Sequence, residues 1–440
     1  MASRLMDSLV TTEALAALFD DASVVHAMLD FEGALARAQA ECGVISRSAG
    51  EAISAACVAE NVDVRALACD GRKQATIAIP LVKALTETVR GKDPESARFV
   101  HWGATSQDVV DTALTLLLRR AHAILADDHR RLEDTLRQLS DEHAGTVMVG
   151  RTLLQAAPPI TFGLKAAGWF AAVHRNWMRL DAAFEDTAIL QFGGASGTLA
   201  ALGDRGIEVS RLLGEELNLR VPEAPWHAHR DRLAAVVTNA GIYTGTLGKI
   251  ARDGVLLMQQ EVGEAEETGG GSSTMPHKRN PALFTNALAC ANRVPGLVAN
   301  FLSGMVQEHE RAAGGLQAEW PTVAGVMEAT GAVLSNVAQA METLTVHADR
   351  MRANIAATRG LIYSERVMML IAGTTGRETA HELLAAASRR ALEEKLTLAQ
   401  VVRGMPDIAE LLTPEQIDGL DVAENYLGAA EIFRKQLLNS

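Results

Sequence analysis

The sequence predicts an all-α fold built around a bundle of long helices. Neither glycine nor proline, the residues that break helices, occurs between Gly103 and Gly145. Within that stretch Val110, Leu114 and Leu117 recur at helical spacing. The composition agrees, because Ala and Leu are abundant whereas aromatic residues make up only 4% of the chain. Strand patterns are confined to short pieces, so helix is expected almost throughout.

Further helices are expected along the chain in order. The first hundred residues are helical with polar breaks, and the stretch that begins after Gly103 opens on a capping-box pattern at residues 105–108. Helices are then expected over 158–180 and 232–259, and in the uninterrupted run between Gly331 and Gly360. The tail after Gly360 is predicted to form shorter helices.

The lengths of these helices predict how the chain is organised. The mean helix of a globular protein has about 11 residues, and the apolar stripes here are unusually wide. Burial on several sides, in a bundle that packs against other copies of the chain, explains both features. We therefore expect an N-terminal helical domain at 1–103, a central long-helix domain at 104–355 and a C-terminal helical domain at 356–440.

Charge and cysteine content limit the function. The net charge of -13 argues against a nucleic-acid binder, and any site for an anion must then be a local cationic pocket. The four cysteines show no paired spacing and suggest reduced thiols in a cytoplasmic protein. No signal-peptide pattern and no run of about 18 uncharged apolar residues occurs, so no membrane association is expected.

The most informative stretch is residues 269–281, Gly-Gly-Gly-Ser-Ser-Thr-Met-Pro-His-Lys-Arg-Asn-Pro. Three glycines give a backbone that can move, two serines supply hydroxyls, and Lys278 and Asn280 add a positive charge and an amide. An acidic run precedes the stretch and an apolar segment follows it, as in an active-site lid hinged onto a buried helix. A flexible surface loop is the alternative for a bare Gly-Ser run, and the residues after it favour the catalytic interpretation.

Two further polar clusters carry candidate substrate ligands. His101 precedes the hydroxyls of Thr105 and Ser106 at an expected helix start, an arrangement that can bind an anion. An ordinary helix cap is the structural alternative. Arg151, Thr152 and Gln155 stand just before an expected proline-started helix and could hold a carboxylate, or Arg151 could simply pair with a surface acid.

Two more clusters are less specific. The small-residue turn at 193–198 permits close backbone approach. In the cluster at 225–232, His227 and His229 lack a Cys, His or Glu partner at ligand spacing, so no metal is expected, and His227 and Arg230 are interpreted as cationic lining for an acidic substrate. Neither a P-loop nor a convincing dinucleotide fingerprint occurs, so no cofactor is expected.

Taken together, these clusters resemble the fumarase/aspartase superfamily, whose signature loop matches residues 272–281 nearly residue for residue. The resemblance covers about residues 15–370. It implies a homotetramer with a twenty-helix core, in which each active site is assembled from three subunits. It also implies reversible elimination next to a carboxylate, through an aci-carboxylate dianion that cationic and hydrogen-bonding groups stabilise.

The resemblance also assigns roles to individual residues. Ser272 takes the position of the catalytic serine, and Lys278 and Asn280 take those of the residues that bind the substrate carboxylate and stabilise the dianion. The positions that it implies for substrate binding, together with candidates from the clusters above, are His101, Thr105, Ser106, Arg151, Thr152, Gln155, His227, Arg230, Ser273, Met275 and His277. Arg279 is a further candidate cation, with a structural role as its alternative.

Two departures from the superfamily pattern indicate the branch. Many members carry a histidine directly after Gly-Arg-Thr and a glutamate four residues after the proline of Asn-Pro, where this chain has Leu153 and Thr285. The chain looks most similar to the bacterial 3-carboxy-cis,cis-muconate cycloisomerases, whose substrate is a tricarboxylate. An intramolecular carboxylate needs no proton to attack or to leave, so the missing histidine fits lactone formation. Adenylosuccinate lyase and an inactive structural paralogue are the alternatives.

Overall fold

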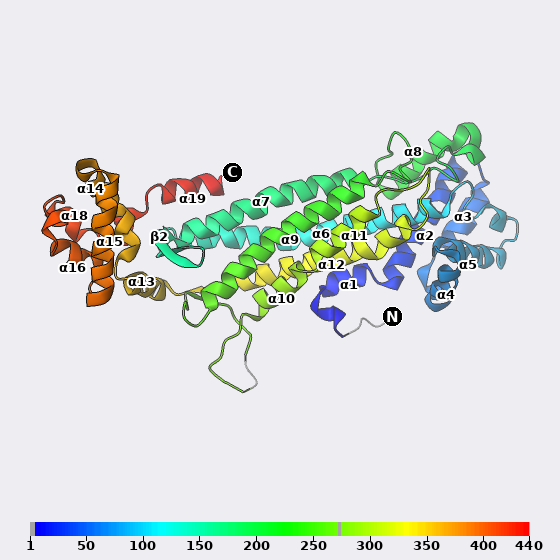
Figure 1. The fold of residues 1–440 in the computed structure, drawn as a ribbon. Helices are drawn as coiled ribbons and strands as arrows, with labels where there is room; N and C mark the ends of the chain where they lie inside the picture. The colour runs from blue at the N-terminus through cyan, green and yellow to red at the C-terminus, as the bar shows by residue number, and fades with distance from the viewer. Residues whose placement is uncertain (1–4, 272–273, 440) are drawn as a thin grey trace. The chain divides into compact units, whose positions relative to one another are not determined.

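The computed structural model describes residues 5–271 and 274–439 of the chain and is predominantly helical (Figure 1). Contacts divide the chain into two compact units. Unit 1 comprises residues 1–130, 175–248 and 286–336, and unit 2 comprises residues 131–174, 249–285 and 337–440. Both units are made of discontinuous segments. The three sequential domains, with boundaries at 103 and 355, stay a prediction.

Unit 1 contains the N-terminal helices and parts of the long ones. The helices that lie wholly within it are α1 (Glu13–Leu18), α2 (Asp21–Glu41), α3 (Arg47–Ala56), α4 (Val64–Gln74), α5 (Ala78–Arg90), α8 (Gly206–Leu217) and α11 (Val294–Ser303). The helices that continue from one unit into the other are α6 (Ser106–Glu142), α7 (Phe162–Thr187), α9 (Asp231–Met258), α10 (Ala282–Ala291) and α12 (Gly315–Glu342).

Close helix packing in unit 1 depends on missing side chains. A Cβ added at Gly331 of α12 would overlap Leu15 of α1 and contact Leu125 of α6. A Cβ added at Gly241 of α9 would lie 2.9 Å from Val298 of α11. Glycine costs a helix about 1 kcal/mol relative to alanine, and here the closer approach of the helices offsets that cost.

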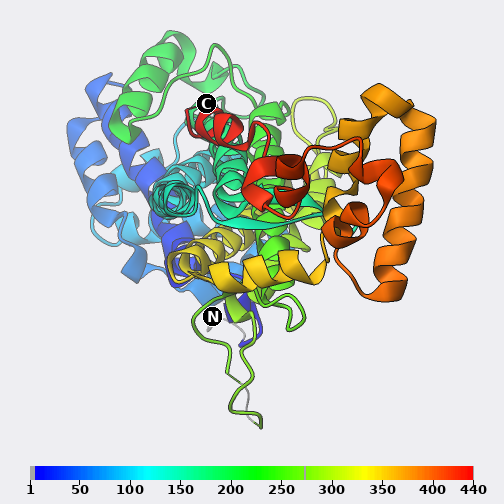
Figure 2. The ribbon, with the colours of Figure 1, turned by 90° about the vertical axis from the view of Figure 1, so that its left-hand side faces the viewer.

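Unit 2 contains the short strands of the described residues and the C-terminal helices. Strands β1 (Val147–Thr152) and β2 (Gln155–Thr161) form an antiparallel hairpin, and β3 (Ala265–Glu266) pairs with β4 (Thr345–Val346). The C-terminal helices are α13 (Ala348–Ala357), α14 (Ser364–Thr375), α15 (Arg377–Glu394), α16 (Leu398–Arg403), α17 (Pro406–Ala409), α18 (Pro414–Asp418) and α19 (Ala430–Leu438). Helices α14 to α18 gather around a common apolar core (Figure 2).

The all-α prediction is confirmed, and the individual bounds differ in two places. Residues 158–161 form part of β2 instead of a helix, and α7 begins at Phe162. Prolines at 158 and 159 lack the N–H groups that a helix interior needs, and a short two-stranded hairpin tolerates them. The helix expected between Gly331 and Gly360 instead begins at Gly315, includes Pro321 and ends at Glu342.

Candidate active site

The start of α6 in unit 1 is built around the buried carboxylate of Asp108. Its Oδ2 accepts hydrogen bonds from the backbone N–H groups of Thr105 (2.9 Å) and Gly194 (2.9 Å), and its Oδ1 accepts one from that of Gly193 (3.0 Å). One of the two hydrogen bonds of the expected capping box is therefore present, the one from the Thr105 backbone N–H to the Asp108 carboxylate. Asp108 also ties the 193–198 turn to the helix start, which is a structural role for that turn.

The hydroxyls of Thr105 and Ser106 meet a cation that the sequence did not reveal. Arg311, between α11 and α12, donates to Thr105 Oγ1 at 2.7 Å, to Ser106 Oγ at 3.1 Å and to Gln107 Oε1 at 3.2 Å. Its guanidinium and these two predicted substrate ligands form one polar group of unit 1. Arg311 is 205 positions away from Ser106, so neither spacing nor periodicity connects them.

His101 precedes this group in the sequence, and its side chain is bound by an acid of α2. Its Nδ1 is 2.6 Å from Glu32 Oε1 of α2, and its side chain is 17% exposed. Burial alone would lower the pKa of His101, but the charge and hydrogen bond of Glu32 and the charge of Asp108 outweigh it, and the pKa is raised. The imidazole is therefore stabilised as a cation, as a ligand for a carboxylate requires.

Two of the predicted cations are not available to a ligand in this conformation. Arg230 is fully buried, and its guanidinium donates to Asp111 at 2.8 and 2.9 Å and to Glu319 at 2.6 and 2.9 Å. His227, 4% exposed, has its Nε2 2.7 Å from Asp108. Arg230 stabilises the α6 region through buried ion pairs and His227 through its contact with Asp108. That these two side chains bind the substrate stays a prediction.

In unit 2, the β1–β2 hairpin carries the second set of predicted residues. Thr152 pairs with Gln155 at its end, and both are exposed. The guanidinium of Arg151 donates to the two oxygens of Glu264 at 2.8 and 2.6 Å, and Glu264 is fully buried. The Arg151–Glu264 ion pair thus joins the hairpin to the segment that precedes the 269–281 loop. A substrate-binding role for Arg151 stays a prediction.

Leu153 and Leu154 form the turn of this hairpin in an unfavourable backbone conformation. Their φ angles are +50° and +64°, and their side chains are 97% and 77% exposed. Two-residue hairpin turns with positive φ normally use Asn or Gly, because a Cβ costs about 1–2 kcal/mol per residue in the left-handed region. The turn therefore keeps two exposed leucines at an energetic cost.

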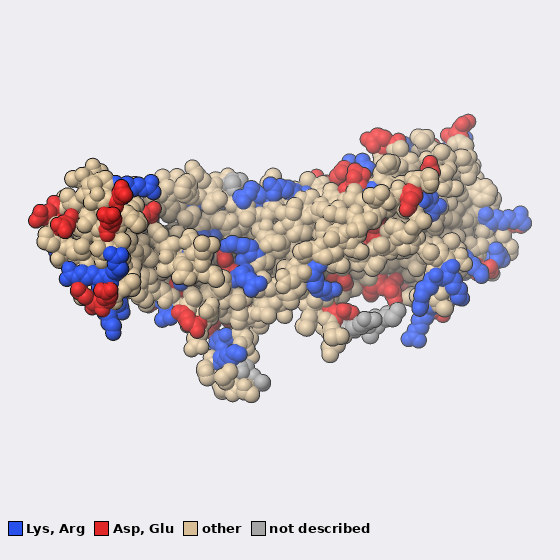
Figure 3. All heavy atoms as spheres, in the orientation of Figure 1, with Lys and Arg blue, Asp and Glu red and all other residues tan. Residues whose placement is uncertain are grey.

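The loop of residues 269–281 is closed at its base by backbone contacts. The backbone N–H of Asn280 donates to the Gly270 carbonyl at 2.7 Å, and the side-chain amide of Asn280 donates to the Gly271 carbonyl at 3.3 Å. Met275, His277 and Lys278 are exposed on this loop, whose basic side chains reach the surface in Figure 3. Ser272 and Ser273 lie outside the described residues.

Two acidic side chains fix the stem of the loop. Glu267 is 1% exposed, and its carboxylate accepts from the backbone N–H groups of Leu283 at 2.8 Å and Phe284 at 3.3 Å, at the start of α10. Burial raises the pKa of Glu267 against these hydrogen bonds. Glu266 lies 3.5 Å from the Arg279 guanidinium, which supports the structural alternative for Arg279.

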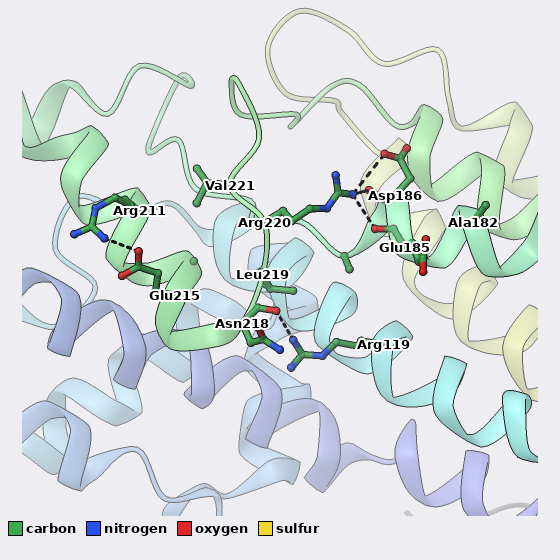
Figure 4. Close-up of a pocket in the computed structure, with 12 residues that line it drawn as sticks. Arg119, Ala182, Glu185, Asp186, Arg211, Glu215, Asn218, Leu219, Arg220 and Val221 are labelled. Atoms are coloured by element: carbon green, nitrogen blue, oxygen red, sulfur yellow. Dashed lines mark hydrogen bonds and ion pairs between the residues drawn. The ribbon is translucent and has the colours of Figure 1, made fainter.

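A separate surface cavity lies in unit 1 between α6, α7 and α8 (Figure 4). Its volume is about 990 Å³, and its lining includes Arg119, Arg211 and Arg220. Arg119 donates to the carbonyls of Leu217 and Asn218, and the other two arginines form ion pairs with acids of the same wall. None of the predicted site residues lines it, so it is not the candidate active site.

No group of three or more His, Cys, Asp or Glu side chains in the described part of the chain is placed to hold a metal ion. No described helix is long and apolar enough to cross a membrane.

Comparison with known proteins agrees with this geometry. A family model described as "Lyase" matches residues 7–296, and one described as "Adenylosuccinate lyase C-terminus" matches residues 360–436. The fold and the polar groups of α6 and the loop thus define a member of the lyase family with the fumarase/aspartase fold, and the chain belongs to that family.

Individual relatives resemble the chain over its whole length. A 3-carboxy-cis,cis-muconate cycloisomerase of Bradyrhizobium diazoefficiens is 47% identical, and the match covers 100% of this chain and 98% of that protein. One from Pseudomonas aeruginosa is 43% identical over 99% of this chain and 96% of that protein. The crystal structure of a 3-carboxy-cis,cis-muconate lactonizing enzyme from Pseudomonas putida superposes with a TM-score of 0.93, at 42% identity, covering 99% of this chain and 98% of that one.

Proposed function

We propose that this protein is a 3-carboxy-cis,cis-muconate cycloisomerase, which converts 3-carboxy-cis,cis-muconate reversibly into 4-carboxymuconolactone in protocatechuate catabolism. The observation that carries the proposal is the similarity, over nearly all of both chains, to relatives with that activity in their names. The cationic groups described above are consistent with a substrate that carries three carboxylates. The free cysteines are consistent with a reducing cytoplasm.

The reaction needs one bond from oxygen to carbon and one proton on carbon. A carboxylate oxygen of the substrate attacks one end of a double bond, and the electron pair moves to the carbon next to another carboxylate. The resulting aci-carboxylate dianion is then protonated at that carbon. Stabilisation of this negative charge is assigned to Lys278, Asn280 and His277 of the loop. In unit 1, His101 and Arg311 are assigned the binding of substrate carboxylates.

Ser272 is the proposed donor of that proton, and the base in the reverse direction. A serine hydroxyl is a poor acid and base at its ordinary pKa, so the positive charge of Lys278 and nearby backbone N–H groups are assigned the role of stabilising its alkoxide. No separate acid is needed at residue 153, because a carboxylate attacks and leaves without a proton. Thr285, at the second departure, donates its hydroxyl to the Pro281 carbonyl at 2.6 Å and so serves the start of α10.

The proposed active form is a homotetramer in which three subunits contribute to each site. Exposed apolar side chains on helices α7, α9 and α11 support self-association: Met178 is 59% exposed, Ile242 53% and Leu302 42%. The exposed Leu153–Leu154 turn of unit 2 supports it as well, because it places two leucines next to the predicted ligands Thr152 and Gln155.

One assay tests the proposed function. Purified protein is mixed with 3-carboxy-cis,cis-muconate and, separately, with adenylosuccinate, while ultraviolet absorbance is followed. Loss of the conjugated-diene absorbance is the expected result. The match of residues 360–436 to the adenylosuccinate lyase C-terminus favours the second substrate, and turnover of adenylosuccinate alone would replace the proposal. Inactivity on both substrates would favour a structural paralogue.

Replacing the proposed proton donor tests the mechanism. Ser272→Ala is expected to abolish turnover while substrate still binds, because the hydroxyl moves the proton and contributes little to binding. Turnover is measured by absorbance and binding by calorimetry. Ser303→Ala, which removes an exposed hydroxyl of α11, is the control and should match the unmodified protein. More than a few per cent of residual activity in Ser272→Ala would remove Ser272 from the proton transfer.

A further inference from the structure

Glu32 is a buried acid that the sequence did not suggest as part of the site. It lies in the middle of α2 and is 1% exposed. Its Oε1 contacts His101 Nδ1, whereas its Oε2 has no hydrogen-bond partner among the described residues. A buried carboxylate with one bonded oxygen is strongly destabilised unless its partner carries a positive charge. The pair is therefore best satisfied when His101 is an imidazolium.

The backbone around His101 is held in the conformation that this pair requires. His101 has a φ of +59°, in the left-handed region that a histidine rarely adopts, and Gly103 has a φ of +78°. Gln39 donates to the Trp102 carbonyl at 2.6 Å. Glu32 and Gln39 are seven residues apart and so lie on the same face of α2. Two side chains of one helix thus fix the turn and the imidazole together.

The groups that surround the imidazole leave one nitrogen available. Nδ1 is committed to Glu32, and Nε2 has no partner among the described residues. From α6, Asp108 acts on His101 by charge, and it is itself bound to His227 and to backbone N–H groups. From the end of α3, the Cys57 thiol near Glu32 stays neutral, because burial and then the charge of Glu32 raise its pKa to about 12.

We propose that Glu32 is a positioning residue that holds His101 as an imidazolium, with its Nε2–H presented to a carboxylate of the substrate. The assignment rests on the proposed function only for the identity of that substrate. Glu32 itself does not touch the substrate. It fixes the ring through Nδ1 and stabilises its charge, so that loss of the His101 proton sets an upper pH limit on substrate binding.

A pH profile of kcat/KM tests the assignment. Glu32→Gln removes the charge and keeps the shape of the side chain. It is expected to raise KM and to lower kcat/KM roughly tenfold to a hundredfold, as for loss of a hydrogen bond between charged groups. The decline of kcat/KM at high pH should also move to lower pH, because the histidine then loses its proton earlier. A Glu32→Gln profile identical to that of the unmodified protein would overturn the assignment.

Another pair of unit 1 offers a matched control. His122 Nε2 and Asp181 lie 2.7 Å apart on α6 and α7, in a more exposed position away from the α6 start. Asp181→Asn also removes the carboxylate partner of a histidine, and it should leave KM and the pH profile unchanged. A shift of equal size in Asp181→Asn would mean that the effect is general and not due to Glu32.

A binding measurement separates this assignment from the proposed reaction. Propane-1,2,3-tricarboxylate is titrated into the protein by calorimetry at several pH values, which requires no turnover. Affinity should fall as pH rises through the His101 transition, and this fall should occur at lower pH in Glu32→Gln. Glu32→Asp retains the charge and serves if Glu32→Gln does not fold, and it should lie closer to the unmodified protein. Tricarboxylate binding without this pH dependence, or no binding, would overturn the role of Glu32, whereas inactivity on the muconate alone would overturn only the reaction.

Discussion

Arg311 shows how a single side chain can organise a polar group. Its three hydrogen bonds join Thr105, Ser106 and Gln107, at the point where α6 begins. A guanidinium presents several N–H groups in one plane, so it can bridge these oxygens and still direct its charge towards a bound carboxylate. We therefore propose that Arg311 orders the two hydroxyls and attracts the substrate.

Substituting Arg311 is expected to impair catalysis more than folding. Arg311→Met should lower kcat/KM by about a hundredfold, since a lost hydrogen bond to a charged group is worth about 1.5–3 kcal/mol. Arg311→Lys should retain only part of the kcat/KM that Arg311→Met loses, because one ammonium group cannot span the three acceptors. Steady-state kinetics measure both effects. Arg211→Met on α8, outside the site, is the control, and equal losses in the two methionine variants would argue against this role.

Arg230 is expected to affect stability. Arg230→Met leaves the buried carboxylates of Asp111 and Glu319 without their cation, so the free energy of unfolding should fall by about 3–5 kcal/mol in urea titrations. Burial raises the pKa of Glu319, although Arg230 opposes this shift. In Arg230→Met, a protonated Glu319 costs less to bury than an ionised one. The loss of unfolding free energy relative to the unmodified protein should therefore be smaller at acidic pH. Arg390→Met, which breaks the exposed pair with Glu394, should change stability by less than about 1 kcal/mol.

The sequence singled out candidate site residues but not the side chains that bind them. His101, Thr105, Ser106 and the loop stood out because polar residues interrupt a helical pattern. Glu32 and Arg311 did not, because their importance depends on contacts between distant segments. One signal was available for Glu32, which is an acid on the apolar face of α2 between Met28 and Leu35.

The loop of residues 269–281 depends on the conformation of one glycine. Gly270 has a φ of +59°, and a Cβ there would overlap the Asn280 carbonyl oxygen. The close approach of these two backbone segments brings the ends of the loop together. Glu267, which binds the start of α10, lies just before the loop in the sequence. Glycine is therefore required at this position by geometry, in addition to any hinge function.

A pair of alanine substitutions distinguishes this requirement from general loop flexibility. Gly270→Ala should reduce kcat strongly, because Asn280 is displaced, while the unfolding free energy changes little at this half-buried loop position. Gly271→Ala has open space for its Cβ and should remain close to the unmodified protein. Turnover and urea unfolding of both variants give the answer, and similar losses of kcat in the two would favour flexibility over the Gly270–Asn280 contact.

The β1–β2 hairpin could not be predicted from local pattern. Its turn lacks the Asn-Gly or Asp-Gly signal, and two prolines in β2 suggested a helix start. The hairpin accommodates Pro158 and Pro159 because it is short and because its pairing register is irregular between Val149 and Gly150. The positive φ angles of Leu153 and Leu154 cost energy, which suggests that these side chains serve a purpose other than the turn itself.

At the level of the whole chain, periodicity predicted the long helices α6, α7 and α9 to within a few residues, because apolar stripes at helical spacing are local properties. It failed for α12, where Pro321 is accommodated inside a helix. The division into two contact units was also not predictable, because each unit is made from segments far apart in the sequence.

Mixing two inactive variants tests the proposed tetramer. If a shared site takes Ser272 and Arg311 from different subunits, Ser272→Ala and Arg311→Met carry their defects on different subunits of that site. Co-refolded mixtures should then regain part of the activity, because some sites receive both intact groups. Sedimentation velocity checks that tetramers form. Mixtures with no more activity than the separate variants would argue against shared sites.

The Leu153–Leu154 turn also bears on how the protein must be produced. Before assembly, a newly made chain would present two almost fully solvent-exposed leucines on a stiff, strained tip. Such a tip can adhere to any other incomplete chain at high concentration. Slow synthesis at low temperature, which lets correct subunits meet before wrong ones, should therefore raise the yield of assembled enzyme.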